Sequence, residues 1–443
     1  MGYTHELLTM EHLPTIVEAT GLIRSGQCSP LELVDHCLQR IQSLDPVLHA
    51  WVRIDADAAR REAIRQQDLL AGGIDLGPLQ GIPLGIKDII DVAGWPTEAG
   101  SSLLAGNVVH EDSAVVERLR QQGAILLGKT VTTEFAFLDP AGTCNPWDPS
   151  HTPGGSSSGS AAAVAAEMCL AALGSQTGGS ITRPASYCGI CGLKPTHGRV
   201  DVRGVVPLSR SLDHLGPLAR SVADLRLLLM ALADWQPEKE PLFEPPKLFV
   251  IREYFLERCD ETIREVTLNA LERLQQAGAD LHSLAPPDSF QHVHAMHRCI
   301  MAVEAAETHF DSFSRQSDAY SSQIAALLEE GLTTFAVDYS LSLRHQHVFR
   351  EQTARMLGDN RVAITPATMT PAPDGLQSTG DPAFNSPWSY AGVPTVTVPC
   401  GLSPDGLPCG LQLIGPPGRE DLLLDTAEWC EDVLDFRARP TIE

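Results

Sequence analysis

Residues 154–166, Gly-Gly-Ser-Ser-Ser-Gly-Ser-Ala-Ala-Ala-Val-Ala-Ala, join a glycine- and serine-rich loop to an alanine-rich stretch. The alanines and the apolar residues after them predict a helix over 160–173. The loop therefore places several hydroxyls and free backbone amides at a helix N-terminus, where anionic oxygens are stabilised.

A second loop, residues 174–181, reads Gly-Ser-Gln-Thr-Gly-Gly-Ser-Ile. Its two glycines let successive backbone amides before Ser180 point at one position, which is the geometry of an oxyanion hole. Lys87, in Gly85-Ile-Lys-Asp88, ends an apolar run, where burial would desolvate its ammonium group and lower its pKa. A neutral lysine can act as a base toward a serine, which is a poor nucleophile alone. The three segments predict a nucleophilic serine site.

The remaining chain has the pattern of an α/β protein. Apolar residues at helical spacing predict surface helices over 14–65, and beyond Gly72 short apolar runs alternate with helical stretches. The proline-rich segment 235–247 is the best boundary candidate, a long helical region covers 291–356, and β-like runs return after 362. We predict a single domain over 1–443, divided into N-terminal helices (1–70), a core (71–235), a mostly helical insertion (236–360) and a return to the core sheet (361–443).

The composition argues against several classes of protein. Lysine and arginine number 32 and acidic residues 56, so the net charge is −24, and we expect phosphate backbones and anionic membrane surfaces to be repelled. No apolar run is long enough to span a bilayer, and the start, residues 1–6, shows no export or anchoring signal. Eleven dispersed cysteines are typical of reduced thiols. We expect a cytoplasmic protein with a small-molecule partner and no nucleic acid or membrane partner; a homodimer is left open.

Two short motifs match other kinds of functional site, but the residues in and around them do not fit the structure that each site requires. Residues 123–130, Gly-Ala-Ile-Leu-Leu-Gly-Lys-Thr, match a phosphate-binding loop, yet the apolar spacers are typical of a buried strand rather than of converging amides. Residues 155–159 match the Gly-x-Ser-x-Gly elbow with Ser157 as nucleophile. Three prolines within 145–153 argue against the central strand that such an elbow requires.

Cysteine and histidine patterns do not predict a metal site. Cys188 and Cys191 have the spacing of half a zinc site but lack a second pair, so two core thiols are favoured. Another candidate ligand set is His292, His294, His297 and Cys299. Because histidines two and three apart on a helix point in different directions, a solvated helix face is favoured there. We predict no metal and no cofactor.

At the serine loops and Lys87 the sequence resembles the amidase signature family of serine amidohydrolases. Residues 154–166 are similar to the family's glycine and serine hallmark, and residues 177–181 are similar to its nucleophile loop. Further similarity lies in residues 83–88, 128–130, 134–135, 192–196, 211–217 and 392–415. The resemblance extends over most of the chain and implies an α/β fold with a large mixed twisted sheet flanked by helices.

The resemblance implies a role for each matched residue. Ser180 would be the acyl-accepting nucleophile, Ser156 the bridging serine after a cis peptide bond, and Lys87 the terminal base. Family members place the two serines 24 residues apart, which selects Ser156 over its serine neighbours. Ser157 would be a supporting hydrogen-bond partner or a structural hydroxyl.

The nucleophile loop would bind the substrate. The backbone amides of Thr177, Gly178, Gly179 and Ser180 would stabilise the oxyanion. Many family members carry Asp before this loop and Arg two residues after the nucleophile, whereas this chain has Gln176 and Thr182, followed by Arg183. The departure concerns the support of the loop and leaves the three catalytic positions filled.

The function implied is a cofactor-independent serine amidase that cleaves linear amide C–N bonds through an acyl-enzyme, with esters and carbamates as further substrates. The alternative is the amidase (glutaminase) subunit of a tRNA-dependent amidotransferase complex. Residues 304–309, Glu-Ala-Ala-Glu-Thr-His, do not resemble the matching segment of those subunits. We expect the substrate pocket between residues 132–138, 301–309 and 369–388, whose aromatic residues suggest an apolar or aryl acyl group.

Overall fold

The computed structural model describes residues 12–237 and 244–442, and the strands of these ranges form one mixed sheet of eleven strands. Their order across the sheet is β1-β3-β2-β4-β6-β5-β10-β11-β9-β7-β8. The strands are β1 (Trp51–Ile54), β2 (Pro83–Lys87), β3 (Ile125–Thr130), β4 (Ala171–Gln176), β5 (Cys191–Lys194), β6 (His214–Ala219), β7 (Lys247–Val250), β8 (Asp280–Ser283), β9 (Val362–Pro366), β10 (Thr395–Leu402) and β11 (Pro408–Ile414).

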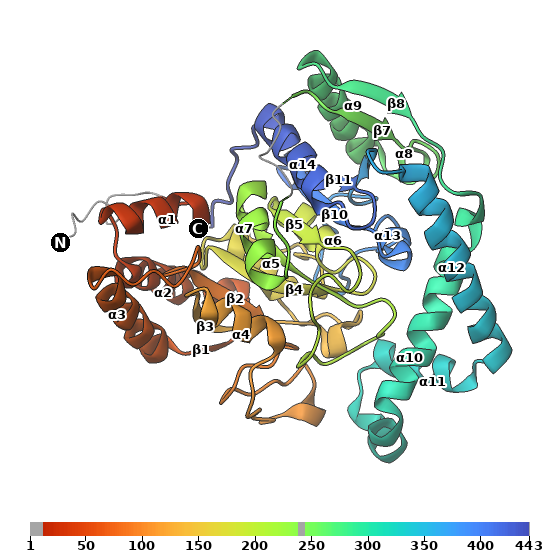
Figure 1. The fold of residues 1–443 in the computed structure, drawn as a ribbon. Helices are drawn as coiled ribbons and strands as arrows, with labels where there is room; N and C mark the ends of the chain where they lie inside the picture. The colour runs from red at the N-terminus through yellow and green to blue at the C-terminus, as the bar shows by residue number, and fades with distance from the viewer. Residues whose placement is uncertain (1–11, 238–243, 443) are drawn as a thin grey trace.

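Helices flank this sheet, so the predicted α/β class with a large mixed sheet is confirmed (Figure 1). The helices are α1 (Ile16–Ser25), α2 (Pro30–Leu48), α3 (Ala56–Ala71), α4 (Ala114–Gln121), α5 (Ser158–Ala165), α6 (Thr182–Cys188), α7 (Val222–Leu232), α8 (Phe255–Arg258), α9 (Glu261–Gln276), α10 (Val293–Gln316), α11 (Ser322–Thr333), α12 (Ala336–Leu357), α13 (Ser386–Ala391) and α14 (Glu420–Leu434). None of the helices in the described ranges is long and apolar enough to cross a membrane.

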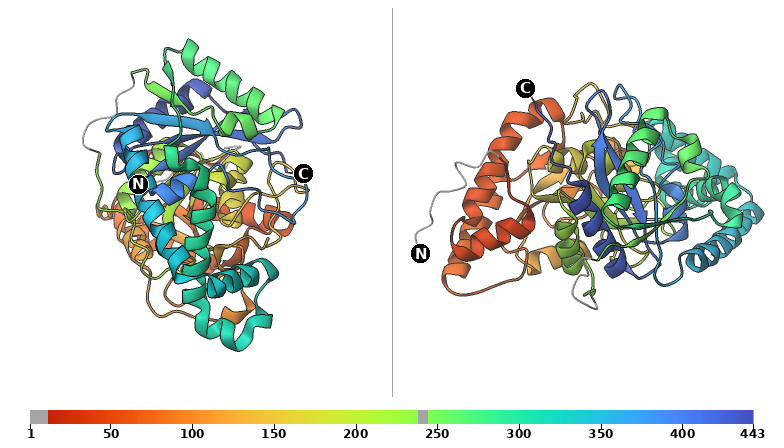
Figure 2. Two further views of the ribbon diagram at one scale, coloured as in Figure 1. Left: turned by 90° about the vertical axis from the view of Figure 1, so that its right-hand side faces the viewer. Right: turned by 90° about the horizontal axis from the view of Figure 1, so that it is seen from above.

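The two ends of the sheet carry different helical layers. Helices α1, α2 and α3 lie together beside β1, whereas α10, α11 and α12 form a bundle on the opposite side of the molecule (Figure 1). Figure 2 shows from two further sides that helices cover the sheet and that α9 lies beside the β7 and β8 edge. After α14 the chain returns toward α1, so the two terminal segments meet.

The neighbouring strands β2 and β4 position the lysine and serine side chains of the candidate site. They run parallel, with Leu84 opposite Ala171 and Ile86 opposite Leu173, so their carboxyl ends lie at the same edge of the sheet. Lys87 ends β2, and the loop after β4 leads to Ser180. Loops that follow adjacent parallel strands form a crevice, which is where ligands bind in α/β proteins.

The predicted helix over 160–173 is shorter in the structure. Helix α5 ends at Ala165, Glu167 adopts a positive φ of 57°, and β4 begins at Ala171. Every residue of α5 is buried, which explains the run of small side chains. A Cβ on Gly159 would lie 2.2 Å from the Ala50 carbonyl oxygen, so only glycine fits there.

The predicted insertion is helical from α10 to α12, but it also contributes strands. β7 and β8 pair in parallel with each other, and β7 pairs with β9, which extends the sheet. The proposed boundary at 235–247 falls partly on residues 238–243, which lie outside the described residues, as does the chain start at 1–6. The apparent phosphate-binding motif at 123–130 contains strand β3, as its apolar spacers predicted.

Candidate active site

Lys87 lies fully buried at the end of β2 and contacts three hydroxyl groups. Its Nζ lies 2.7 Å from Ser156 Oγ, 2.8 Å from Ser175 Oγ and 3.1 Å from Ser157 Oγ. Burial lowers the pKa of Lys87 well below its ordinary value, and the charge of Asp213 opposes this shift only in part. A lysine surrounded by hydroxyls rather than carboxylates is placed to be neutral, as a base must be.

The serine loop approaches Lys87 with two of its hydroxyls. The peptide bond between Gly155 and Ser156 is cis, as the family resemblance implied. Ser157 donates its hydroxyl hydrogen to the Ser175 carbonyl oxygen at 3.2 Å, and its Oγ accepts from the Ser175 backbone N–H. Ser157 must therefore accept, not donate, in its contact with Lys87, because its only hydroxyl hydrogen is used.

Ser175 was not singled out from the sequence. It is the fifth residue of β4, and its hydroxyl is brought to Lys87 by the parallel pairing of β2 with β4. The only sequence signal was its place next to the nucleophile loop, within the quoted segment 174–181.

Ser180 lies between β4 and α6, is nearly buried and lines a cavity. It forms no hydrogen bond with Ser156 or Ser157 in the described part of the chain, so the structure joins Lys87 to the serine loop but leaves the Ser180 hydroxyl unpaired. Within the described ranges, the backbone N–H groups of Gly178, Gly179 and Ser180 also have no protein acceptor. These amides are free to bind an oxyanion.

The departure at Gln176 and Thr182 forms a neutral support for the nucleophile loop. Gln176 Oε1 accepts from the backbone N–H groups of Ile181 at 2.8 Å and Thr182 at 2.9 Å. Gln176 Nε2 donates to Ser389 Oγ, which in turn donates to the Gly178 carbonyl oxygen. An amide therefore holds both ends of the loop without a charge.

Arg183, the other departure, is fully buried and connects the two serine loops. Its Nη2 donates to the Gly155 carbonyl oxygen at 2.7 Å and to Thr379 Oγ1 at 3.2 Å. Burial lowers the pKa of this guanidinium from its ordinary value. The contact fixes the peptide before Ser156 relative to the helix that follows Ser180.

Asp213 is a second residue that the sequence did not identify as part of the site. It accepts from Thr177 Oγ1 at 2.5 Å and from the backbone N–H groups of Leu208 and Ser209. Burial raises the pKa of Asp213 to about 6. In the sequence, Asp213 stood out only as a member of segment 211–217, which resembles the amidase family, and no role was assigned to it.

The cavity that contains Ser180 has a volume of about 340 Å³, which is suitable for a small ligand. The cavity is lined by residues from each of the three segments predicted to form the pocket, 132–138, 301–309 and 369–388, for example Phe137, Met301 and Pro382. Many of the other lining side chains are polar or charged. The predicted aromatic character is limited, since Phe384 and Trp388 are buried in the core.

The solvated face predicted for His292, His294 and His297 is present only at His292, which is exposed and precedes α10. His297 is buried, lines the cavity, and donates from Nε2 to the Thr177 carbonyl oxygen at 3.0 Å. Burial lowers the pKa of His297 to about 4. His294 is half-buried and contacts Tyr254 and Ser386. The prediction failed because α10 packs against the nucleophile loop, a long-range contact that helical spacing does not reveal.

No cluster of potential metal ligands occurs within residues 12–237 and 244–442. The eleven cysteines are free; Cys188 Sγ donates to the Pro153 carbonyl oxygen, and Cys191 Sγ donates to Glu431. Burial raises the pKa of both thiols, so they are unreactive core groups.

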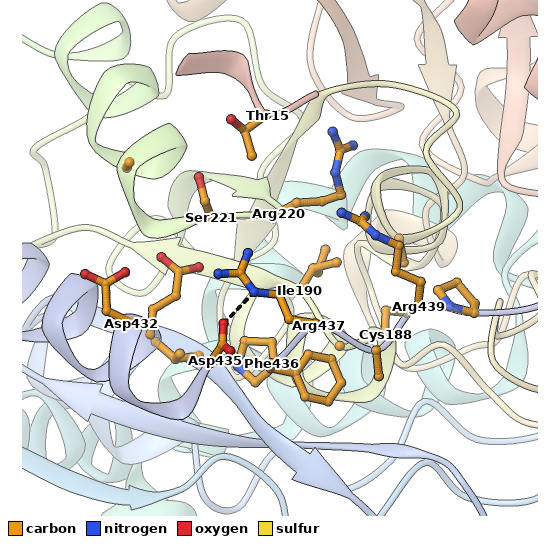
Figure 3. Close-up of a pocket in the computed structure, with 18 of the residues that line it drawn as sticks. Thr15, Cys188, Ile190, Arg220, Ser221, Asp432, Asp435, Phe436, Arg437 and Arg439 are labelled. Carbon is orange, nitrogen blue, oxygen red and sulfur yellow. Dashed lines mark hydrogen bonds and ion pairs between the residues drawn. The ribbon is translucent and has the colours of Figure 1, made fainter. Parts of the chain in front are cut away.

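A second cavity, of about 320 Å³, lies where the terminal segments meet (Figure 3). Arg220, Arg437 and Arg439 border it together with Asp432 and Asp435, and Arg437 is paired with Asp435. The arginines serve structural contacts: Arg220 donates to backbone carbonyls near α1, and Arg439 pairs with Glu167. This cavity contains no group resembling the lysine and serine cluster, so the Ser180 cavity is the candidate active site.

Comparisons with known proteins identify the family of this chain. A family model described as Amidase matches residues 32–424, so the chain belongs to the amidase family. The A subunit of the glutamyl-tRNA(Gln) amidotransferase of Prochlorococcus marinus (strain MIT 9313) is 37% identical, covering 96% of this chain and 98% of the relative. Its counterpart of the same name from Synechococcus sp. (strain CC9311) is 36% identical, with the same coverage.

Solved structures support the same family. A crystal structure of an amidase is 33% identical with a TM-score of 0.87, covering 95% of this chain and 99% of its own. The native peptide amidase of Stenotrophomonas maltophilia is 28% identical with a TM-score of 0.83, covering 96% and 98%. The chain is therefore an amidase-family hydrolase in fold and in sequence.

The comparisons overturn the prediction about partners. The sequence predicted a small-molecule substrate and no nucleic acid partner, whereas the matched relatives are subunits of an enzyme named for a glutamyl-tRNA. The prediction was wrong because it took the net charge of −24 as evidence about partners. The charge of one chain describes its own average surface and not the surface of an assembly.

Proposed function

We propose that this chain is the glutaminase subunit of a glutamyl-tRNA amidotransferase complex, with Ser180 as the nucleophile, Ser156 as the bridging serine and Lys87 as the base. The likeness to two amidotransferase subunits over nearly their whole length supports the complex. The contact of 2.7 Å between Lys87 Nζ and Ser156 Oγ carries the chemical proposal.

The hydrogen bonds around Lys87 can be completed by a neutral amine. A neutral amine has two N–H donors and one lone pair. Ser157 must accept from Nζ, because its own hydrogen goes to the Ser175 carbonyl oxygen. If Ser175 takes the second donor, the lone pair is left for the Ser156 hydroxyl. Ser156 then has an acceptor for its proton and can receive the proton of Ser180.

In the acylation step, Ser180 Oγ attacks the side-chain amide carbon of glutamine while its proton passes to Ser156 and that of Ser156 passes to Lys87. The amides of Gly178, Gly179 and Ser180 would bind the oxyanion, each donor contributing about 3 kcal/mol. Collapse of the intermediate breaks the C–N bond, and Ser156 returns a proton to the leaving ammonia.

In the deacylation step, water attacks the acyl ester on Ser180, and its proton follows the same route through Ser156 to Lys87. The ester bond breaks, Ser180 recovers its proton, and glutamate leaves. The sum is glutamine plus water giving glutamate plus ammonia, with no cofactor required. In the complex, ammonia would be the product that the partner subunits use.

The first test is the intact mass of the protein after exposure to a fluorophosphonate. We expect a single adduct in the wild type, no adduct in Ser180→Ala, and slow adduct formation in Ser156→Ala. Ser158→Ala is the matched control, because Ser158 Oγ donates to the Gly154 carbonyl oxygen and does not contact Lys87. An adduct that persists in Ser180→Ala would refute the assigned nucleophile.

The second test measures glutamate release from glutamine by the chain alone and by the chain purified with its partner subunits. We expect glutaminase activity to rise when the partners and glutamyl-tRNA are present, and to disappear in the complex carrying Ser180→Ala. Labelling of Ser180 without any glutaminase activity in the assembled complex would refute the glutaminase assignment and retain the serine hydrolase.

A further inference from the structure

Three arginines line the cavity that contains Ser180, and they differ in what they contact. Arg183 is buried and donates to the Gly155 carbonyl oxygen and to Thr379. Arg298 forms an ion pair with Glu330 at 2.7 Å. Arg258, at the end of α8, is exposed, and its guanidinium forms no ion pair or hydrogen bond with any residue in the ranges 12–237 and 244–442.

Tyr254 holds this free arginine at the cavity. The guanidinium carbon of Arg258 lies 4.8 Å from the centre of the Tyr254 ring, and both side chains line the cavity. Stacking uses the face of the guanidinium and leaves the N–H groups at its edge free. The Tyr254 hydroxyl lies 2.7 Å from His294 Nε2, so the ring is fixed from α10.

The backbone of Tyr254 adds a second, independent observation. Its φ is +69°, a conformation that an aromatic residue rarely adopts and that the surrounding structure must impose. Such residues cluster at ligand-binding positions. The strained residue is therefore the one whose ring stacks against the Arg258 guanidinium.

The cavity also contains a carboxylate that suits the same ligand. Asp381 lines it and accepts from the Ala383 backbone N–H at 2.8 Å, with no ion pair in the described part of the chain. Charges of Arg258 and of Asp381 both act on Tyr254 and His294. The cavity therefore offers a cation and an anion that both act on the same two aromatic side chains, and neither forms an ion pair within the described residues.

We propose that Arg258 is a specificity-determining residue that binds a carboxylate group of the amide substrate. The inference rests on the proposed function, since glutamine carries an α-carboxylate beside the side chain that reacts. A guanidinium edge binds a carboxylate through two parallel N–H···O hydrogen bonds. Tyr254 acts as the positioning residue for this anchor, and Asp381 suits the ammonium group of the same substrate.

The test compares glutamine with pentanamide, a neutral amide of the same chain length, in the assembled complex. We expect Arg258→Met to raise KM for glutamine at least tenfold with kcat changed less than threefold, and to leave kcat/KM for pentanamide within twofold. Arg258→Lys should recover part of the loss. Arg252→Met is the matched control, because Arg252 is an exposed arginine of the same segment that does not line the cavity, and we expect its KM for glutamine to stay within twofold.

Substrate binding can be measured directly if the complex turns over glutamine too slowly for kinetic analysis. Calorimetry with the Ser180→Ala complex should show glutamine and glutarate binding at least tenfold weaker after Arg258→Met, with binding unchanged after Arg252→Met. Equal effects of Arg258→Met on glutamine and pentanamide, or no effect on carboxylate binding, would overturn the anchor. Fluorophosphonate labelling that persists in either case would show that the failure concerns the anchor and not the serine chemistry.

Discussion

Lys87 lies in an environment that differs strongly from the solvent-exposed setting of an ordinary lysine. It is fully buried and contacts three hydroxyls, and burial lowers its pKa well below the ordinary value. A base with a lowered pKa loses its proton at a lower pH than a free lysine does. The direction of the shift therefore sets the direction of the pH dependence.

We expect kcat/KM to rise with pH through the lowered pKa of Lys87 and then to level off. Lys87→Met should lose this limb and lower kcat by about 10³-fold. The control is Lys194→Met: Lys194 is also fully buried, with a pKa lowered to about 7, but contacts only backbone carbonyls such as that of Val393. A flat profile over about pH 6 to 9 with rate-limiting chemistry would contradict the neutral base.

Gln176 gives a second prediction at the same scale. Gln176→Leu would leave the buried N–H groups of Ile181 and Thr182 without an acceptor, at a cost of about 1–3 kcal/mol each. We expect the fluorophosphonate labelling rate of Ser180 to fall about tenfold or more, because these N–H groups hold the turn that follows the nucleophile. Gln176→Glu keeps the acceptor and should recover most of the rate. Equal labelling of wild type and Gln176→Leu would show that the amide does not position the loop.

Single residues were predictable from the sequence where a local pattern identified them. The two serine loops and the buried lysine were chosen on glycine content, spacing and an apolar run, and the structure joins Lys87 directly to Ser156 and Ser157. Ser175 and Asp213 were not chosen, because their contacts depend on which strands pair and on a loop from residues 207–213. Neither fact is encoded in a short window of sequence.

Secondary-structure elements were predicted well in type and poorly in extent. The alanine-rich stretch predicted one helix over 160–173, but α5 stops at Ala165 and β4 starts at Ala171. Alanine and leucine favour helix in isolation, so the sequence carried no strong stop signal. The chain turns where Glu167 takes a positive φ and its carboxylate binds the Leu13 backbone N–H, which is a long-range contact.

Strand β3 provides the prediction at the scale of elements. A Cβ on Gly128 would lie 1.9 Å from the Arg53 carbonyl oxygen in β1, so Gly128→Ala should separate the two strands and lower the free energy of unfolding by about 1–3 kcal/mol or more. Urea denaturation measures the loss. Gly21→Ala is the control of opposite sign: Gly21 lies inside α1 with open space around it, and alanine there should add about 0.5–1 kcal/mol. A Gly128→Ala variant as stable as wild type would refute the close approach.

At the scale of the whole molecule, the α/β class followed from the sequence, whereas the order of strands did not. Strands β4 and β6 pair although they are separated by α6 and β5, and β10 lies between β5 and β11. Such pairings are decided by burial of both faces of the sheet across the full chain. The partner prediction failed for a related reason, because net charge is summed over a surface without regard to which part of it meets another protein.

Glu304 connects helix α10 to the loop before β6, and it carries the prediction at this scale. On α10, its carboxylate accepts from Ser209 Oγ at 2.6 Å, from the Ser211 backbone N–H at 2.9 Å, from the Ser211 hydroxyl, and from the Tyr339 hydroxyl at 3.0 Å. The loop it holds continues to Asp213, which binds the Thr177 hydroxyl in the nucleophile loop. Helix α10 is therefore part of the support of the candidate active site.

We expect Glu304→Leu to lower the free energy of unfolding by about 3 kcal/mol, because hydroxyls and an N–H that now bond to a charged acceptor lose it. The labelling rate of Ser180 should fall with it, since the loop up to Asp213 loses its attachment to α10. Glu307→Leu, an exposed change one turn further along the same helix, should alter stability by less than about 0.5 kcal/mol. Thermal unfolding and fluorophosphonate labelling of both variants separate the two effects. If Glu304→Leu lowered the free energy of unfolding without changing the labelling rate, helix α10 would stabilise the fold without positioning the nucleophile loop.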